Sequence, residues 1–269
     1  MPEKNVDQSK KYCSYCDHTG IIHEPYFDHL GRVPLSPCPK CILSKCQCQG
    51  EDPYYYFKDQ QIQDCYCREI RLKIAKINKL YNQSGIDKLF RWKFFTDFVV
   101  KNKELGQAKN MAYDLVTKFP KVDRGLFLWG NPGTGKTLLS SIILTELITR
   151  HAVQGLYMKI SRNFFSRLKD SFHEGSPTYG KAYTIEREFA ETDLLIIDDF
   201  GVQRDSPWEQ ETLYNLIDAR YEAKKFTIFT SNNNPLKALK DLSNGRILSR
   251  IKEMCRIIEI KGEDYREKL

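Results

Sequence analysis

The chain has 269 residues, of which 41% are hydrophobic, and it carries a net charge of +7. No stretch approaches the ~20 apolar residues of a membrane span, and the first residues lack the apolar segment of a signal peptide. The sequence therefore predicts a cytoplasmic protein of one or two domains, in which clustered cysteines indicate a metal site rather than disulfides. The positive charge is compatible with nucleic acid binding but does not establish it.

Cysteines are concentrated near the N-terminus, where eight of the nine fall into four close pairs. The pairs are Cys13 and Cys16, Cys38 and Cys41, Cys46 and Cys48, and Cys65 and Cys67. The first two pairs have the C-x2-C spacing typical of a closed zinc site. The last two have a less usual C-x-C spacing and could hold a second zinc or be buried or redox-active thiols. His18, His23 and His29 are possible substitute ligands.

Two segments separate the cysteines from the next motif. Residues 67–81 show apolar side chains at helical spacing with basic residues between them, which predicts a basic amphipathic helix. Residues 89–100 are rich in aromatic side chains, which we expect to pack a linker onto the following domain rather than to bind a partner. The sequence thus predicts a zinc-binding domain at 1–80, a linker at 81–104 and a second domain at 105–269.

A glycine-rich loop follows an apolar run that ends at Trp129, and an apolar-periodic helix follows the loop. We expect the nucleotide to be bound by Gly130, Asn131, Pro132, Gly133, Thr134, Gly135, Lys136, Thr137 and Leu138. The strand–loop–helix context is what the pattern G-x-x-x-x-G-K-[ST] requires, because backbone N–H groups and the helix N-terminus then face the phosphates. Lys136 would reach the β- and γ-phosphates, and Thr137 would offer its hydroxyl to Mg²⁺.

Beyond a short strand at 155–160, Ser161 is expected to cap a helix over 162–172, and another helix is expected over 179–191. A buried parallel strand then ends in two carboxylates. Asp198 would hold Mg²⁺ through water, and Asp199, in a position where glutamate is often found, would polarise the attacking water. Asn232, at the tip of the next strand, could orient that water against the γ-phosphate. Cys255 is expected to be a small core residue.

Together these motifs resemble the AAA+ family, and within it the DnaC/DnaI/IstB group of bacterial helicase loaders. The resemblance covers residues 105–260. It depends on segments that are absent from generic phosphate-loop proteins as well as on the common motifs. The segments are Gly130 to Thr137, Leu194 to Gly201, Ile217 to Tyr221, Thr230 to Asn232 and Leu248 to Ile251.

The resemblance implies an α/β fold with a parallel sheet of order 5-1-4-3-2, no α-helical lid, and ATP-driven self-association. It implies that Arg250 reaches the ATP of a neighbouring subunit, with Arg220 and Arg246 as the alternatives. It also implies that the helical insertion at 161–191 contacts single-stranded DNA. The cations there are Lys159, Arg162, Arg167, Lys169, Lys181 and Arg187, and the aromatic side chains that could stack on bases are Phe165, Tyr179 and Tyr183.

The expected function is that of an ATPase that loads the replicative DNA helicase and docks on it through the cysteine-rich region, which resembles the zinc module of DnaI. The first alternative is a transposition ATPase of the IstB kind that acts on duplex DNA. The second is a zinc-bearing adaptor that binds nucleotide as a switch and hydrolyses little, which the aspartate at position 199 leaves open.

Overall fold

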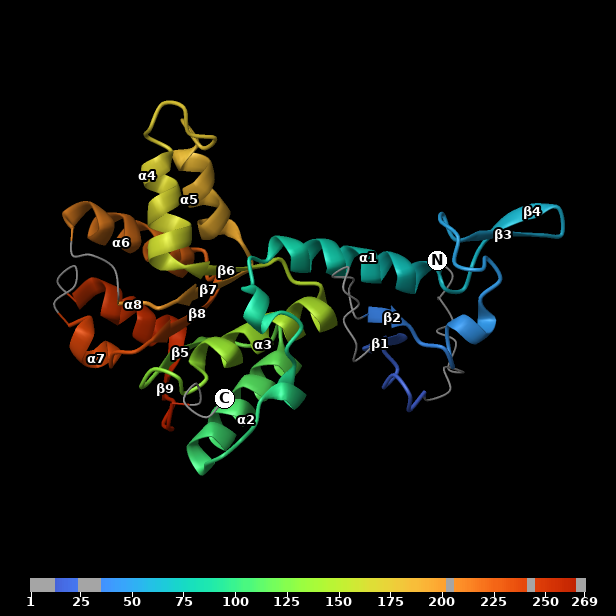
Figure 1. Ribbon diagram of the computed structural model, residues 1–269, viewed down its shortest axis with the longest axis horizontal. Coiled ribbons are helices and arrows are strands. Elements are labelled where there is room, and N and C mark those ends of the chain that lie inside the picture. The colour runs from blue at the N-terminus through green and yellow to red at the C-terminus, as the bar shows by residue number, and fades with distance from the viewer. Residues whose placement is uncertain (1–12, 24–34, 202–205, 241–244, 265–269) are drawn as a thin grey trace, which may run out of the picture. The chain divides into compact units, whose positions relative to one another are not determined.

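The computed structural model describes residues 13–23, 35–201, 206–240 and 245–264. The chain divides into two compact units, Met1–Lys79 and Leu80–Leu269, and each is described by itself (Figure 1). Among the described residues, no helix is long and apolar enough to cross a membrane.

The N-terminal unit contains two small antiparallel hairpins. Strand β1 (Ile21–His23) pairs with β2 (Leu35–Pro37), and β3 (Tyr55–Lys58) pairs with β4 (Gln61–Asp64). A single turn of 3₁₀ helix, η1 (Leu43–Lys45), lies between the hairpins in sequence. The central buried cluster of this unit consists of Ile42 and five cysteines. So few apolar side chains give a small domain little hydrophobic stabilisation, and such domains usually need metals or disulfides.

The basic amphipathic helix predicted at 67–81 is confirmed as α1 (Arg68–Gln83). It begins directly after the last cysteine of the unit and continues past the boundary between the two units. Residues expected to form the linker lie in the second unit, where they include η2 (Lys88–Phe90) and η3 (Phe95–Asp97). Trp92, Phe95 and Phe98 are buried there, which confirms that this aromatic segment packs onto the ATPase domain.

A five-stranded parallel sheet forms the centre of the second unit. Its strands are β5 (Gly125–Trp129), β6 (Gly155–Lys159), β7 (Leu194–Asp198), β8 (Phe226–Ser231) and β9 (Cys255–Glu259). The spatial order is β6-β7-β8-β5-β9. Numbered from β5, this is the predicted order 5-1-4-3-2 read from the opposite edge. Every residue of β7 is buried, as expected for a strand covered on both faces.

Helices cover both faces of the sheet (Figure 1). On one face lie α2 (Lys103–Lys118) and α3 (Lys136–His151), and on the other lie α6 (Pro207–Glu222) and α8 (Arg246–Met254). The side chains of Asn102 and Ser206 cap α2 and α6 by accepting hydrogen bonds from free backbone N–H groups of the first turn. A short helix, α7 (Pro235–Ala238), follows β8.

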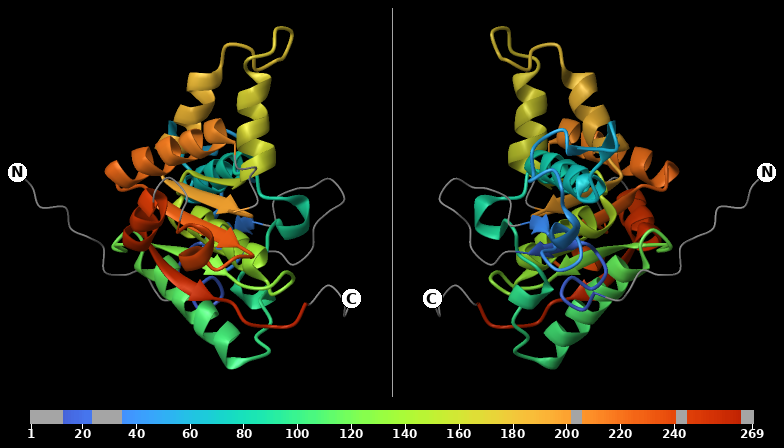
Figure 2. Two further views of the ribbon diagram at one scale, coloured as in Figure 1. Left: turned by 90° about the vertical axis from the view of Figure 1, so that its left-hand side faces the viewer. Right: turned by 90° about the vertical axis from the view of Figure 1, so that its right-hand side faces the viewer.

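Between β6 and β7 the chain forms a helical insertion. It contains the π-helical turn η4 (Ile160–Phe165), α4 (Ser166–Asp170) and α5 (Ala182–Glu191). Figure 2 shows this insertion projecting beyond the sheet in both views. The prediction that Ser161 caps the first helix is wrong. The helical segment already starts at Ile160, and the side chain of Asn163 accepts the backbone N–H of Lys159 instead.

Candidate nucleotide and metal sites

The phosphate-binding loop joins β5 to α3, as predicted. Gly135 precedes α3 with a φ of 95°, a conformation that glycine adopts without strain. The ammonium group of Lys136 donates to the backbone oxygens of Gly130, at 2.8 Å, and Asn131, at 2.7 Å. The lysine side chain therefore lies across the loop, on the side where a phosphate group would bind. The hydroxyl of Thr134 also donates to the Asn131 oxygen, at 2.9 Å.

Asp198 ends β7 and is almost fully buried. Its Oδ1 accepts hydrogen bonds from the hydroxyl of Thr137 at 3.0 Å and from that of Thr230 at 2.5 Å. Its Oδ2 accepts a short hydrogen bond from the phenol of Tyr157 on β6. The structure thus brings Thr137 and Asp198 together, as the sequence predicts. Tyr157 and Thr230 also donate to the carboxylate. Neither contact was predicted, because Tyr157 belongs to no motif and Thr230, although part of a segment that carries the resemblance, was given no role.

Burial and the neighbouring carboxylate of Asp198 raise the pKa of Tyr157 above its ordinary value. The phenol is therefore protonated at neutral pH and acts as a donor. A hydroxyl and a carboxylate supply the hard oxygen ligands that Mg²⁺ prefers. Thr137 and Asp198 fit that cation, which when bound would offset the negative charge of the phosphates.

Asp199 and Asn232 directly follow the carboxyl ends of two neighbouring parallel strands, β7 and β8. Asp199 follows β7 with a φ of 57°, and its backbone N–H donates to Thr230 at 3.1 Å. Its left-handed conformation, which aspartate tolerates better than most residues, turns the chain directly after Asp198. Asn232 follows β8 and is exposed. Asn234 caps α7 and is a turn residue, as expected.

The segment after β9 runs along the phosphate loop. The backbone N–H of Ile260 donates to the Trp129 oxygen at 2.7 Å, and a Cβ at Gly130 would collide with the backbone oxygen of Ile260. Further on, a Cβ at Gly133 would collide with the carboxylate of Asp264. An acidic side chain therefore lies directly against the loop. The sequence analysis missed this contact, which no local pattern indicates.

The three candidate arginines differ in their surroundings. Arg250 on α8 forms an ion pair with Asp218 of α6 at 2.5 Å and lies over the ring of Tyr214. Arg246 is exposed at the start of the same helix. Arg220 is fully buried, so it is wrong as an alternative for reaching a neighbouring subunit.

Arg220 instead joins the insertion to the sheet. Its guanidinium donates to the backbone oxygens of Phe189 and Thr192 at the end of α5, at 2.8 and 2.9 Å. It also donates to the backbone oxygen of Phe226 at 2.6 Å and to the side-chain hydroxyl of Thr227 at 2.9 Å, both in β8. Burial lowers its pKa to about 9, which leaves it charged at neutral pH. The arginine therefore fixes the end of α5 against the first two residues of β8.

Aromatic side chains of the insertion divide into core and surface. Phe165 is buried, so its prediction as a base-stacking residue is wrong, whereas Tyr179 and Tyr183 are 52% and 73% exposed. Phe172 is also exposed at 61% and was not singled out. Most of the predicted cations lie in ion pairs. The pairs are Lys159 with Asp87, Arg167 with Glu188, Lys169 with the buried Glu209, and Arg187 with Glu191. Lys181 bonds a backbone oxygen, and Arg162 is exposed.

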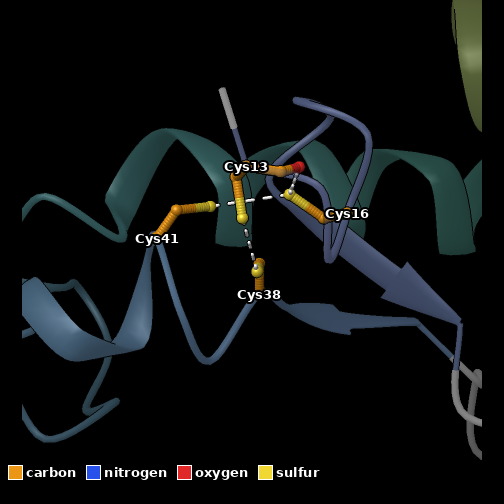
Figure 3. Close-up of side chains that lie close together, drawn as sticks. All are labelled: Cys13, Cys16, Cys38 and Cys41. Atoms are coloured by element: carbon orange, nitrogen blue, oxygen red, sulfur yellow. Dashed lines mark hydrogen bonds between the residues drawn. The ribbon is translucent and has the colours of Figure 1, made fainter. Parts of the chain in front are cut away.

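The first two cysteine pairs converge on one point (Figure 3). The sulfur of Cys13 lies 3.8 Å from that of Cys38, and the sulfur of Cys16 lies 3.5 Å from that of Cys41. Four thiolates about 2.3 Å from a tetrahedral zinc would be separated by about 3.8 Å. These separations therefore fit a zinc ion. No histidine among the described residues joins the group, and His29 lies outside them.

The second group is equally compact. The sulfur of Cys46 lies 3.7 Å from Cys48 and 3.6 Å from Cys67, and that of Cys65 lies 3.8 Å from Cys46. The guanidinium of Arg71 donates to Cys67 at 3.3 Å and would offset part of the negative charge of four thiolates. The unusual C-x-C spacing thus also brings four sulfurs together at separations that fit zinc.

In each group, one thiol has a pKa below its ordinary value. Burial opposes ionisation of Cys65, but backbone N–H groups, among them that of Gln47 at 3.3 Å, lower its pKa to about 6. Cys38 is similarly buried, and backbone N–H groups lower its pKa to about 7. Backbone donors that stabilise a thiolate are a common feature of structural zinc sites, because the ligand is the ionised form.

The comparisons agree with this geometry. Residues 72–269 match the family of IstB-like ATP-binding proteins. The replicative helicase loader DnaC of Escherichia coli K12 is 25% identical over 203 residues, which are 76% of this chain and 80% of that protein. The uncharacterised Bacillus subtilis protein YqaM is 27% identical over 280 residues, covering 93% of this chain and 83% of its own length. The latter match therefore extends into the cysteine-rich unit.

Among solved structures, the crystal structure of the DnaC helicase loader superposes with a TM-score of 0.57 at 26% identity. It covers 65% of this chain and the whole of that one. The assembled loop, the buried Asp198 and the strand order are those of an AAA+ phosphate-loop ATPase. This chain therefore belongs to the IstB-like ATP-binding family, and its second unit is an AAA+ domain homologous to that of the DnaC helicase loaders.

Proposed function

We propose that this protein is an ATPase that loads the replicative DNA helicase onto single-stranded DNA. The observation that carries the proposal is the assembled nucleotide site. Lys136, Thr137 and Asp198 meet at one edge of the sheet, in a chain related to a replicative helicase loader over most of its length. ATP would be bound by the loop from Gly130 to Leu138, with Thr137 and Asp198 as the Mg²⁺ side of the site.

In the reaction that we propose, each side chain has a separate task. Lys136 leaves the loop oxygens and donates to the phosphates. Asp199 accepts a proton from the attacking water, and Asn232 orients that water. Arg250 of one subunit supplies positive charge to the ATP of the next, which requires self-association and release from Asp218.

Two surfaces would contact the partners. The N-terminal unit, stabilised by zinc in the two cysteine groups, would dock on the replicative helicase. The insertion would contact single-stranded DNA, because its exposed aromatic side chains, Phe172, Tyr179 and Tyr183, can stack on unpaired bases whatever their sequence. Arg162 and the cations in surface ion pairs would supply the phosphate contacts.

The family match favours one alternative, an IstB-like transposition ATPase that acts on duplex DNA. A binding experiment separates the two functions. The full chain with ATP and Mg²⁺ is mixed with the purified replicative helicase of its host, and with single-stranded and duplex oligonucleotides of equal length. A helicase complex and a preference for the single strand support the loader. Duplex preference without helicase binding would favour the alternative. A phosphate-release assay on the same mixtures tests the adaptor, which would bind ATP without turnover.

A further inference from the structure

In the part of the chain that the structure describes, the Asp198 carboxylate accepts hydrogen bonds from the hydroxyls of Thr137, Thr230 and Tyr157. Tyr157 differs from the other two because it lies in β6, which flanks β7 on the side away from the centre of the sheet. Tyr157 lies in β6, at the edge of the sheet, and is only 5% exposed. Its hydroxyl donates to Oδ2, while Thr137 and Thr230 both donate to Oδ1. Oδ1 is thus held by α3 and β8, and Oδ2 by β6.

Edge strands are usually the least constrained part of a sheet, but β6 is held at Tyr157. The backbone N–H of Tyr157 donates to the oxygen of Ser84 at 2.6 Å. Lys159, two residues further along, forms an ion pair with Asp87 at 3.5 Å. Ser84 is itself fully buried, so the segment 84–87 covers the open edge of the strand. The phenol is consequently fixed in place by its backbone as well as by its burial.

We propose that Tyr157 is a positioning residue that orients Asp198 for the divalent cation of the nucleotide site. A carboxylate held at only one oxygen can rotate about its terminal bond, and this torsion is broad. The bond from Tyr157 to Oδ2 removes that freedom. Partners of this kind, which touch a metal ligand rather than the metal, commonly matter about 10- to 100-fold for metal affinity. The inference rests on the proposed function, because it requires that Asp198 serve a metal-bound nucleotide.

The experiment compares nucleotide binding with and without a divalent cation. Tyr157→Phe removes the hydroxyl and keeps the ring. Binding of a fluorescent ATP analogue is measured in EDTA and then during a Mn²⁺ titration, with bound Mn²⁺ followed by electron paramagnetic resonance. We expect metal-free affinity within about twofold of wild type and a Mn²⁺ requirement raised about tenfold.

The matched control is Tyr81→Phe, which removes the hydroxyl of another buried tyrosine. That hydroxyl lies near Thr145 and accepts the backbone N–H of Trp92, far in sequence from the carboxylate. It should lose stability without any change in the Mn²⁺ titration. Should Tyr157→Phe not fold, Tyr157→Met, whose flexible side chain adapts to irregular spaces, also removes the donor and should raise the Mn²⁺ requirement in the same direction.

The results separate the inference from the function on which it rests. A wild-type protein whose ATP binding ignores Mn²⁺ would contradict the proposed function. A wild-type protein that needs Mn²⁺, together with a Tyr157→Phe protein that has the same Mn²⁺ requirement, would overturn the positioning role alone. An equal shift in Tyr81→Phe would overturn it as well, because the effect would then be general destabilisation.

Discussion

At the scale of single residues, the site separates nucleotide binding from hydrolysis. Lys136→Ala should weaken ATP binding by about 10- to 100-fold, because one charged hydrogen bond is worth about 1.5–3 kcal/mol. Asp199→Asn should bind ATP as wild type does but lower turnover by about 100-fold or more, since the water loses its proton acceptor. Isothermal titration and a steady-state phosphate assay measure the two effects. Normal turnover in Asp199→Asn would show that another group activates the water.

For Asp264 we predict the opposite effect on ATP affinity from that of Lys136. Its carboxylate lies against Gly133 in the loop that would bind the phosphates, so it should repel ATP. Asp264→Asn should therefore tighten ATP binding, by about two- to fivefold for a charge at the protein surface. Glu263→Gln, which removes an exposed carboxylate one residue earlier, is the control and should change little. Weaker binding in Asp264→Asn would instead mean that the carboxylate holds the nucleotide.

How far the sequence can predict the site depends on where the contacts come from. Lys136 and Thr137 could be assigned because a phosphate is bound by consecutive residues, which leave a local pattern. Tyr157 and Asp264 could not, because they reach the site through the packing of β6 and through the path of the chain after β9. Arg220 and Arg250 both appear in the sequence as basic residues of helices. Only the structure distinguishes them, because Arg220 is fully buried and structural, whereas Arg250 is partly exposed and remains the candidate finger.

At the scale of elements, the main prediction concerns α8 and a neighbouring subunit. Arg250→Ala should bind ATP normally but hydrolyse it about 1000-fold more slowly, which is the usual contribution of an arginine finger. Asp218→Asn is the matched control, because it breaks the same ion pair and leaves the guanidinium in place. Mixing Arg250→Ala with Lys136→Ala should restore some activity at interfaces that join an intact site to an intact arginine. Equal loss of turnover in Asp218→Asn and Arg250→Ala would show that the pair is structural.

The elements themselves were largely predictable. The strands of the sheet are apolar runs of the right length, and their order follows from the family resemblance. The start of the insertion was not predictable, because the helical segment begins at Ile160, directly after β6. The side chain of Asn163, not that of Ser161, accepts a backbone N–H there, that of Lys159. The convergence of the two C-x-C pairs was also open, since it depends on the β3–β4 hairpin that lies between them in sequence.

At the scale of the whole molecule, the N-terminal unit should depend on metal. Elemental analysis of the full chain should find two zinc ions per chain. Cys16→Ser and Cys65→Ser should each lower the count to one, because each removes a ligand from a different group. Cys255→Ser is the control, since Cys255 is buried in β9 and belongs to neither group. A count of two that survives Cys65→Ser would contradict the second site.

The central claim, that ATP-dependent helicase loading is the function, is tested most directly by a loading assay. The full chain, the replicative helicase of its host and closed circular single-stranded DNA are incubated with ATP and Mg²⁺, and the helicase that co-purifies with the circles is measured. We predict that loading requires the protein, fails with Lys136→Ala, and fails with Cys16→Ser although this variant still binds ATP. Helicase loading that is equal with wild type and Lys136→Ala, or that is absent with wild type despite ATP turnover, would contradict the account.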